Sequence, residues 1–283
     1  MLEACLKARC HYLDLTGELE VIDACYARHD DALAAGIAVV PAVGFNVAPM
    51  DCLAAKLAHE GDRLTALELG FEGYDISAGT AKTYSEGIAL GNARFAGGRL
   101  LRSPIAWELR PIPFKNGVQR GLLIPYGELV SCHRATGIAN ISVFMVPPPS
   151  LVPLLKYGPR FSPLMRFAWV KRAVDRFAEL RFPGPDEEAR RTGRTQIWGR
   201  VTRADGSQRQ GFLETPEPYQ FTLAIALGAV ERVLAGSVRP GAWTPSQAFG
   251  SEFMMEVGGC AMELEPPAFT AATRALPTAS SSA

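Results

Sequence analysis

Short apolar runs and amphipathic stretches alternate through the first sixty residues. Residues 11–15 and 37–40 form apolar runs of strand length, and the second run is bounded by Gly36 and Pro41. Between them, residues 18–35 place apolar side chains at helical spacing, which predicts one helix that ends at Gly36. Two strands joined by a helix through short links are expected to pair in parallel, with a right-handed crossover.

The loop after the second run leads into another predicted helix, at residues 49–59. Gly44 and Asn46 tolerate unusual backbone angles, and Pro49 suits the first turn of a helix. In an open α/β sheet, ligands bind beyond the carboxyl ends of the strands, which is where this loop lies. An ordinary connection between a strand and a helix explains the same residues, so both interpretations stay open.

Beyond residue 61 the pattern changes from parallel crossovers to strands joined by turns. A long helix is predicted at residues 219–234, and the turn at 204–207 predicts a hairpin of two strands. The other predicted strands lie at residues 63–71, 121–125, 129–133 and 140–145. The chain therefore divides into a parallel α/β unit at 1–60, a mixed α+β domain at 61–265, and a tail at 266–283 that we expect to be disordered.

Residues 147–182 mix aliphatic and aromatic side chains with basic ones. An apolar face with a basic rim suits a hydrophobic ligand, a protein partner or peripheral contact with an anionic membrane surface. An amphipathic helical pair packed on the core explains the pattern equally well. Nucleic acid is not expected to bind here, because the basic residues accompany aliphatic side chains rather than exposed stacking platforms.

A helix predicted to begin near residue 77 carries the small and hydroxyl residues Ser77, Gly79 and Thr80 in its first turn. Free backbone N–H groups at such a helix start can bind a carboxylate or a polarised carbonyl of a substrate. A plain helix cap is the alternative interpretation.

Three side chains near the predicted strand 129–133 can take part in proton transfer or anion binding, namely Tyr126, His133 and Arg134. We take these three as candidate catalytic residues of the second domain, although an arginine on a surface turn is a common structural feature. Asp14 and Asp51 are expected to hold loops rather than to do chemistry.

Composition narrows the class of protein. Lys+Arg and Asp+Glu balance at 29 each and hydrophobic residues make up 48% of the chain, which fits a globular protein and does not favour a nucleic acid partner. The six cysteines form no C-x-x-C pair, and the four histidines do not join them at a zinc spacing. We therefore expect free thiols, no metal site and a cytoplasmic location.

Five motifs occur in an order that resembles the saccharopine dehydrogenase-like proteins, and most of all their branch of trans-acting enoyl reductases. They are His-Tyr-Leu-Asp-Leu-Thr-Gly-Glu at 11–18, Gly-Phe-Asn-Val-Ala-Pro-Met-Asp at 44–51, Ser-Ala-Gly-Thr at 77–80, Arg-Ala-Thr-Gly at 134–137 and Thr-Pro-Ser-Gln-Ala-Phe-Gly at 244–250. Each motif is weak alone, but five in this order are fairly specific. The resemblance extends to about residue 259.

The resemblance implies a Rossmann domain that binds NADP(H), a second mixed-sheet domain over the active cleft, and hydride transfer. The fold class is thus α/β, with a partial Rossmann-like parallel sheet followed by a mixed, largely antiparallel α+β substrate domain. The substrate would be an imine in the saccharopine enzymes and an unsaturated acyl lipid precursor in the enoyl reductase branch. The residues implied to face the nicotinamide are Gly17, Glu18, Gly44, Phe45, Asn46, Val47 and Pro49.

The glycine-rich phosphate cradle of such a domain is absent from this sequence. Members of the family carry it upstream of the segment that matches Leu2. We therefore expect weak or absent cofactor binding and a shortened product, a mis-assigned start or a half-site completed from elsewhere.

The alternative to an oxidoreductase is a non-catalytic binding or assembly protein derived from the same fold. An incompletely covered parallel sheet would then be covered by self-association, which predicts a homo-oligomer.

Overall fold

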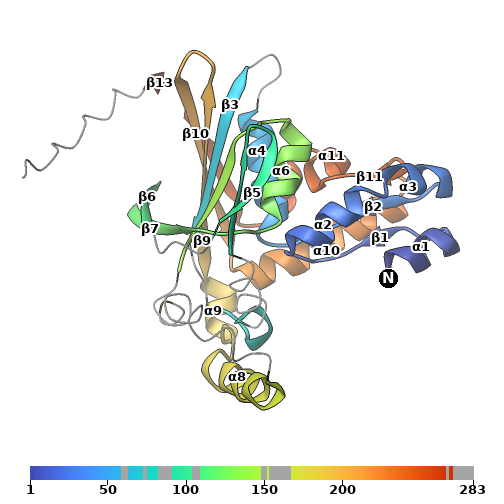
Figure 1. Ribbon diagram of the computed structural model, residues 1–283, viewed down its shortest axis with the longest axis horizontal. Coiled ribbons are helices and arrows are strands. Elements are labelled where there is room, and N and C mark those ends of the chain that lie inside the picture. The colour runs from blue at the N-terminus through green and yellow to red at the C-terminus, as the bar shows by residue number, and fades with distance from the viewer. Residues whose placement is uncertain are drawn as a thin grey trace, which may run out of the picture.

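The computed structural model describes residues 1–58, 63–72, 75–81, 91–103, 109–147, 152, 167–265 and 268–269. A small parallel sheet with its helices lies at one end of the molecule, and a large mixed sheet lies at the other (Figure 1).

The parallel layer begins with α1 (Leu2–Ala8) and continues through β1 (Tyr12–Leu13), α2 (Leu19–Tyr26), α3 (His29–Ala35) and β2 (Ala38–Val40). β1 pairs with β2 in parallel, which confirms the predicted crossover. The single helix predicted at 18–35 is wrong, because the chain forms two helices there. The apolar repeat lapses around Arg28, and Asp30 and Asp31 place negative charge in the first turn of α3, where it is favourable.

A third parallel strand, β11 (Gly241–Ala242), pairs with the other side of β2. It lies just over two hundred residues further along the chain and is only two residues long, so no local sequence pattern predicts it. The parallel sheet therefore has the order β1-β2-β11.

The mixed sheet joins ten strands within the described residues. Its main path runs β12 (Ala261–Leu264), β10 (Ser207–Pro216), β9 (Arg194–Arg203), β3 (Leu64–Glu72), β8 (Ile141–Val146), β4 (Asn92–Ala96) and β5 (Arg99–Ser103). Off this path, β7 (Gly117–Leu123) pairs with β8 and with β6 (Leu109–Phe114), while β13 (Ala268–Phe269) pairs with β10. Among the described strands of this sheet, only β3 and β8 run parallel to each other, which agrees with the largely antiparallel domain predicted.

The predicted hairpin is confirmed by β9 and β10, and the predicted long helix by α10 (Pro218–Leu234). The strand predicted at 129–133 is wrong, because those residues belong to α6 (Glu128–Thr136). A short apolar run does not distinguish a buried strand from a buried helix. Here Gly137, with φ 70°, ends the helix, and α6 packs against both β8 and the helix that precedes β3.

That preceding helix, α4 (Val47–Leu57), links the two sheets, and nine of its eleven residues are buried. It covers β9 and β10 and contacts α6, so protein surrounds most of its circumference. Two glycines let it approach the sheet closely. A Cβ at Gly199 would lie 2.8 Å from Leu57 Cδ1, and one at Gly211 would lie 3.1 Å from Leu53 Cδ1.

Asp51 stands in the middle of α4 and is fully buried. Its carboxylate accepts hydrogen bonds from the Ser131 hydroxyl at 3.0 Å and from the Ser246 backbone N–H at 2.7 Å. Tyr26 extends the network through a 3.2 Å contact with Ser131. Burial raises the pKa of Asp51, and its hydrogen bonds to Ser246, Thr244 and Ser131 act in the opposite direction. Asp51 therefore joins three helices, whereas the sequence predicted that it would hold loops.

The remaining helices are α8 (Ala168–Arg181), α9 (Glu187–Thr192), α11 (Pro245–Phe249) and the 3₁₀ turn η2 (Phe253–Glu256). None of the helices in the described ranges has the length and apolar content needed to span a membrane. The helix predicted from residue 77 is described only over residues 78–81, most of 147–166 lies outside the described residues, and so does the predicted tail apart from β13.

The close approach of α4 to β9 gives a stability prediction. Gly199→Ala inserts a methyl group among the Leu53, Leu57 and Leu69 side chains and should lower the free energy of unfolding by about 1–3 kcal/mol. Gly258→Ala is the matched control, because nothing lies within 4 Å of a Cβ there. Urea unfolding of both variants measures the difference, and equal stabilities would contradict this packing.

Candidate active site

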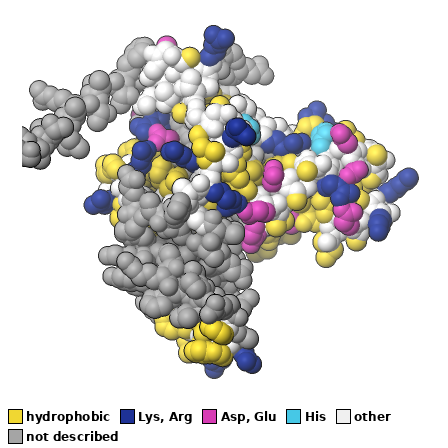
Figure 2. Space-filling model, in the orientation of Figure 1, with side chains coloured by type: hydrophobic (Ala, Val, Ile, Leu, Met, Phe, Trp, Pro, Cys, Tyr) yellow, Lys and Arg dark blue, Asp and Glu magenta, His cyan; other side chains and the backbone are white. Residues whose placement is uncertain are grey.

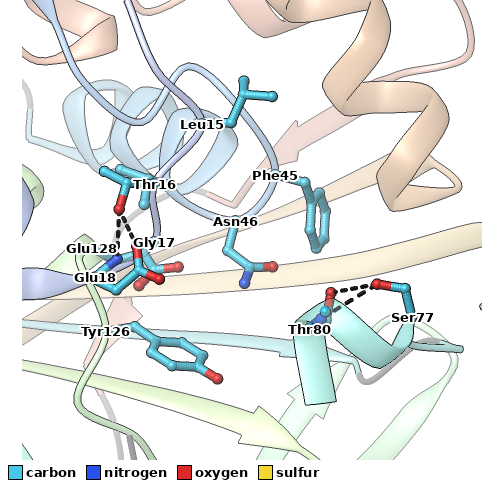
Figure 3. A pocket seen from close by; sticks show the side chains of 12 residues that line it. Leu15, Thr16, Gly17, Glu18, Phe45, Asn46, Ser77, Thr80, Tyr126 and Glu128 are labelled. Atoms are coloured by element: carbon cyan, nitrogen blue, oxygen red, sulfur yellow. Dashed lines mark hydrogen bonds between the residues drawn. The ribbon is translucent and has the colours of Figure 1, made fainter. Parts of the chain in front are cut away.

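A cavity of about 460 Å³ opens between the carboxyl ends of β1 and β2 and the mixed domain (Figure 3). Four segments that are distant in sequence meet around it. Its lining residues are Leu15, Thr16, Gly17, Glu18, Phe45, Asn46, Val47, Ser77, Gly79, Thr80, Tyr126 and Glu128. The position matches the ligand position expected for an open α/β sheet.

The loop after β1 forms one wall, and Asp14 holds it in place. Its carboxylate accepts hydrogen bonds from the Tyr12 hydroxyl at 2.6 Å, the Thr16 N–H at 3.0 Å and the Ala42 N–H at 2.8 Å. These bonds join the loop after β1 to the loop after β2. Asp14 therefore holds loops, as predicted, and keeps Thr16 and its neighbours at the cavity edge.

Phe45 and Asn46 form a second wall at the start of α4. The Phe45 N–H donates to the Thr222 hydroxyl at 3.0 Å, and its ring packs edge-to-face against Phe71 and Phe221. Asn46 precedes the helix without capping it through its side chain, and its buried Oδ1 has no hydrogen-bond partner among the described residues. In Figure 3 the Asn46 amide points into the cavity. A polar group positioned in this way is available to a ligand.

Ser77 and Thr80 form a third wall, opposite Asn46 (Figure 3). The Thr80 N–H donates to Ser77 Oγ at 3.3 Å, so Ser77 caps this helix start, as the alternative interpretation held. Tyr219 of α10 orients the pair, because its hydroxyl accepts from the Ser77 N–H at 2.8 Å and lies 2.9 Å from Thr80 Oγ1. Capping and ligand binding are compatible, since the residues also face the cavity.

Tyr126 and Glu128 enter from the start of α6. The Gly127 N–H between them donates to the Gly17 carbonyl at 3.0 Å, which ties α6 to the loop after β1. Gly127 permits this approach, because a Cβ there would lie 2.2 Å from Ile22 Cδ1. The Tyr126 side chain points across the cavity toward Thr80 in Figure 3.

Glu128 is the chemically distinctive residue of the cavity and was not predicted as a site residue. Its residue surface is 1% exposed, and neither carboxyl oxygen forms a hydrogen bond with another described residue. Burial raises its pKa from 4.5 to about 7, and its own backbone N–H acts in the opposite direction. A carboxyl group in this state can hold or release a proton near neutral pH. The only sequence signal was an acid directly before an apolar run.

The cavity brings together Gly17, Glu18, Phe45, Asn46 and Val47 with the predicted substrate residues Ser77, Gly79 and Thr80. Gly44 and Pro49 are neighbours in sequence of its lining residues but do not line it.

Of the three candidate catalytic residues, only Tyr126 lines the cavity. The His133 ring stacks on Phe95 with centroids 4.3 Å apart, and its Nδ1 lies 2.9 Å from the Ile138 carbonyl oxygen. Arg134 lies over the Tyr26 ring and donates to the Ala242 carbonyl at 2.9 Å. These contacts give His133 and Arg134 structural partners away from the cavity, because the helix that replaces the predicted strand turns them toward other elements.

Among the residues that the structure describes, no group of three or more His, Cys, Asp or Glu side chains is arranged to hold a metal ion. The cysteines that the sequence predicts to be free are free thiols.

No protein-family model matches the sequence, and no curated protein matches it either. Among solved structures, apo histidine-tagged saccharopine dehydrogenase (L-Glu forming) from Saccharomyces cerevisiae has a similar fold, with a TM-score of 0.54 at 10% sequence identity. The match covers 94% of this chain and 82% of that chain. At this identity the similarity establishes the fold alone. It supports the predicted class, a partial Rossmann-like sheet followed by a mixed α+β domain.

Burial of Glu128 makes stability depend on pH. The folded protein binds the proton of the Glu128 carboxyl group more tightly than the unfolded chain does. The resulting contribution to the free energy of unfolding is therefore complete below about pH 4.5 and is lost as the pH rises through about 7. When complete, this contribution to the free energy of unfolding is about 3 kcal/mol. Glu128→Gln should flatten the decline in the free energy of unfolding between about pH 5 and about pH 8. Urea titrations measure this, with the exposed Glu231→Gln as the control; an unchanged slope in Glu128→Gln would contradict the assignment.

Proposed function

We propose that the chain is an NADP(H)-linked oxidoreductase that transfers a hydride to an unsaturated acyl or imine substrate in this cavity. The observation that supports this most directly is the position of Glu128. A buried, unpartnered carboxyl group faces a cavity at the carboxyl ends of parallel strands, where α/β enzymes bind cofactors.

The cavity suits the nicotinamide end of such a cofactor. Phe45 and Val47 offer an apolar wall, and the unpartnered Oδ1 of Asn46 can accept a hydrogen bond from a carboxamide. A Cβ at Gly17 would meet nothing within 4 Å, so that side of the cavity is open. The lining is less suited to the cofactor phosphates, because its described residues include two glutamates and no lysine or arginine. We therefore propose weak cofactor binding.

When bound, the cofactor would supply the hydride, and the chain itself would position the acceptor and hold or release a proton. Ser77 and Thr80 would orient the polar end of the substrate through their hydroxyls, held by Tyr219. Glu128 would hold the proton, since its pKa of about 7 keeps both protonation states accessible near neutral pH. Tyr126, beside it in the cavity, would share that role.

The acidic residues of the cavity lining favour some substrate charges over others. Glu18 and Glu128 disfavour a free carboxylate and are compatible with an uncharged thioester or a protonated imine. An acyl thioester would agree with the enoyl reductase branch and a role in lipid metabolism, and an imine with the saccharopine enzymes.

A fluorescence titration with NADPH, and separately with NADH, tests the proposal. We expect saturable binding with a dissociation constant of about 0.1 mM or weaker, which corresponds to about 5.5 kcal/mol or less. Asn46→Ala should weaken it, while Asn116→Ala, on a turn of the mixed sheet, should not. Absence of binding up to about 1 mM would leave only the similarity of fold.

A second candidate function, a non-catalytic assembly protein that forms homo-oligomers, is favoured by the outer face of α10. Four exposed apolar side chains recur there at alternating spacings of four and three residues, namely Leu223, Leu227, Val230 and Leu234. This spacing is typical of helices that pair along an apolar seam. We propose that two copies of the chain meet along α10.

Light scattering coupled to size-exclusion chromatography tests this assembly. The dimer should dissociate in Leu227→Glu, which places a charge in the middle of the seam. The matched control is Val118→Glu, because Val118 is an exposed apolar residue on β7, away from α10. A monomeric parent protein would exclude the assembly without affecting the proposed oxidoreductase.

A further inference from the structure

α8 presents an exposed face to solvent at the lower end of the molecule (Figures 1 and 2). Trp169, Phe177 and Leu180 are 69%, 62% and 73% exposed. At 100° per residue these three side chains fall within an arc of about 80° on one side of the helix. Large apolar residues so exposed and so close together mark a surface that contacts something else.

Basic residues border this apolar arc. Arg172 and Arg176 are exposed on the same side of α8, one turn apart. The segment 151–182 as a whole contains seven basic and two acidic residues, a net charge of +5 in a chain whose total charge is zero. Figure 2 shows dark blue Lys and Arg side chains at the edge of the yellow cluster on the described part of this helix.

We propose that α8 docks this protein on an anionic membrane surface. A tryptophan and a phenylalanine beside a leucine suit the boundary between headgroups and acyl chains, and arginines can reach the phosphates while their stems lie along the apolar face. The charge of the segment complements acidic lipids. A second copy of the chain is a poorer occupant, because a two-fold pairing of this face would bring Arg172 and Arg176 of one copy against those of the other.

The chain that follows α8 contacts one wall of the cavity. Phe182, directly after α8, is buried, and Pro183 pairs with Ser77 in an isolated β-bridge. Ser77 lines the cavity. A membrane under α8 would therefore lie near a wall of the cavity, although docking does not depend on the function proposed for it.

Co-sedimentation of the full chain with lipid vesicles tests the proposal. Vesicles of phosphatidylcholine with phosphatidylserine should bind it roughly tenfold more strongly than phosphatidylcholine alone. Binding should fall when salt rises from about 0.1 M to about 1 M, because the screening length shortens from about 10 Å to about 3 Å. The double variant Trp169→Ala/Leu180→Ala should bind roughly tenfold more weakly, and Arg172→Glu roughly fivefold.

Two matched variants control for general loss of apolar or basic surface. Val118→Ala removes a side chain that is 70% exposed on β7, and Arg99→Glu reverses an exposed charge on β5; both should bind like the parent protein. Circular dichroism confirms that each variant is folded. The proposal is overturned if anionic vesicles do not bind the chain, if both kinds of vesicle bind equally, or if the α8 variants bind like the controls. A dimer that dissociates in the α8 double variant would also overturn it, in favour of self-association.

Discussion

The buried carboxylate of Asp51 is the interaction on which the arrangement of this protein depends. It lies in a helix that is mostly buried, and its partners Ser131 and Ser246 come from α6 and from α11. A buried carboxylate is costly unless it is hydrogen-bonded, and leaving one partner unsatisfied costs about 1–3 kcal/mol. The helices on both sides of α4 are therefore fixed in position relative to each other. Because β11 lies just before α11, the same network also places the third strand of the parallel sheet.

This fixed position of α6 determines the cavity. Ser131 lies one turn after Glu128, so the bond that anchors α6 to Asp51 also places the start of α6 beside the loop after β1. Gly127 allows the two backbones to approach, and Glu128 then faces the cavity without a partner. Asp51 and Glu128, which are both almost fully buried, differ in their hydrogen bonding. Asp51 is satisfied and holds helices together, whereas Glu128 is unsatisfied and keeps its proton to about pH 7.

A fold of this kind supports several kinds of chemistry, so the similarity to a yeast saccharopine dehydrogenase does not identify the function. The function has to be inferred from the residues that line the cavity. These residues provide an apolar wall at Phe45, hydroxyls at Ser77 and Thr80, and acids at Glu18 and Glu128. They suit a neutral or cationic reacting group more than a phosphate or a free carboxylate. The exposed apolar faces of α8 and α10 lie on separate elements, and their residues do not line the cavity.

The sequence alone determined the features that depend on local pattern. The parallel crossover of β1 and β2, the hairpin of β9 and β10, and the helix α10 each follow from periodicity bounded by glycine or proline. The resemblance to the saccharopine dehydrogenase-like proteins implied that Gly17, Phe45 and Asn46 face the nicotinamide, and the structure places these residues in the cavity lining.

Only the tertiary structure decided which distant segments meet. The run at 129–133 became a helix because α4 and β8 offer it a face to pack against, and this turned His133 and Arg134 away from the cavity while bringing in Glu128. A two-residue strand such as β11 carries no periodicity at all. The physical reason is common to these cases: periodicity records which side of an element is buried, whereas the partner that buries it, and the pKa that results, depend on residues far away in the chain.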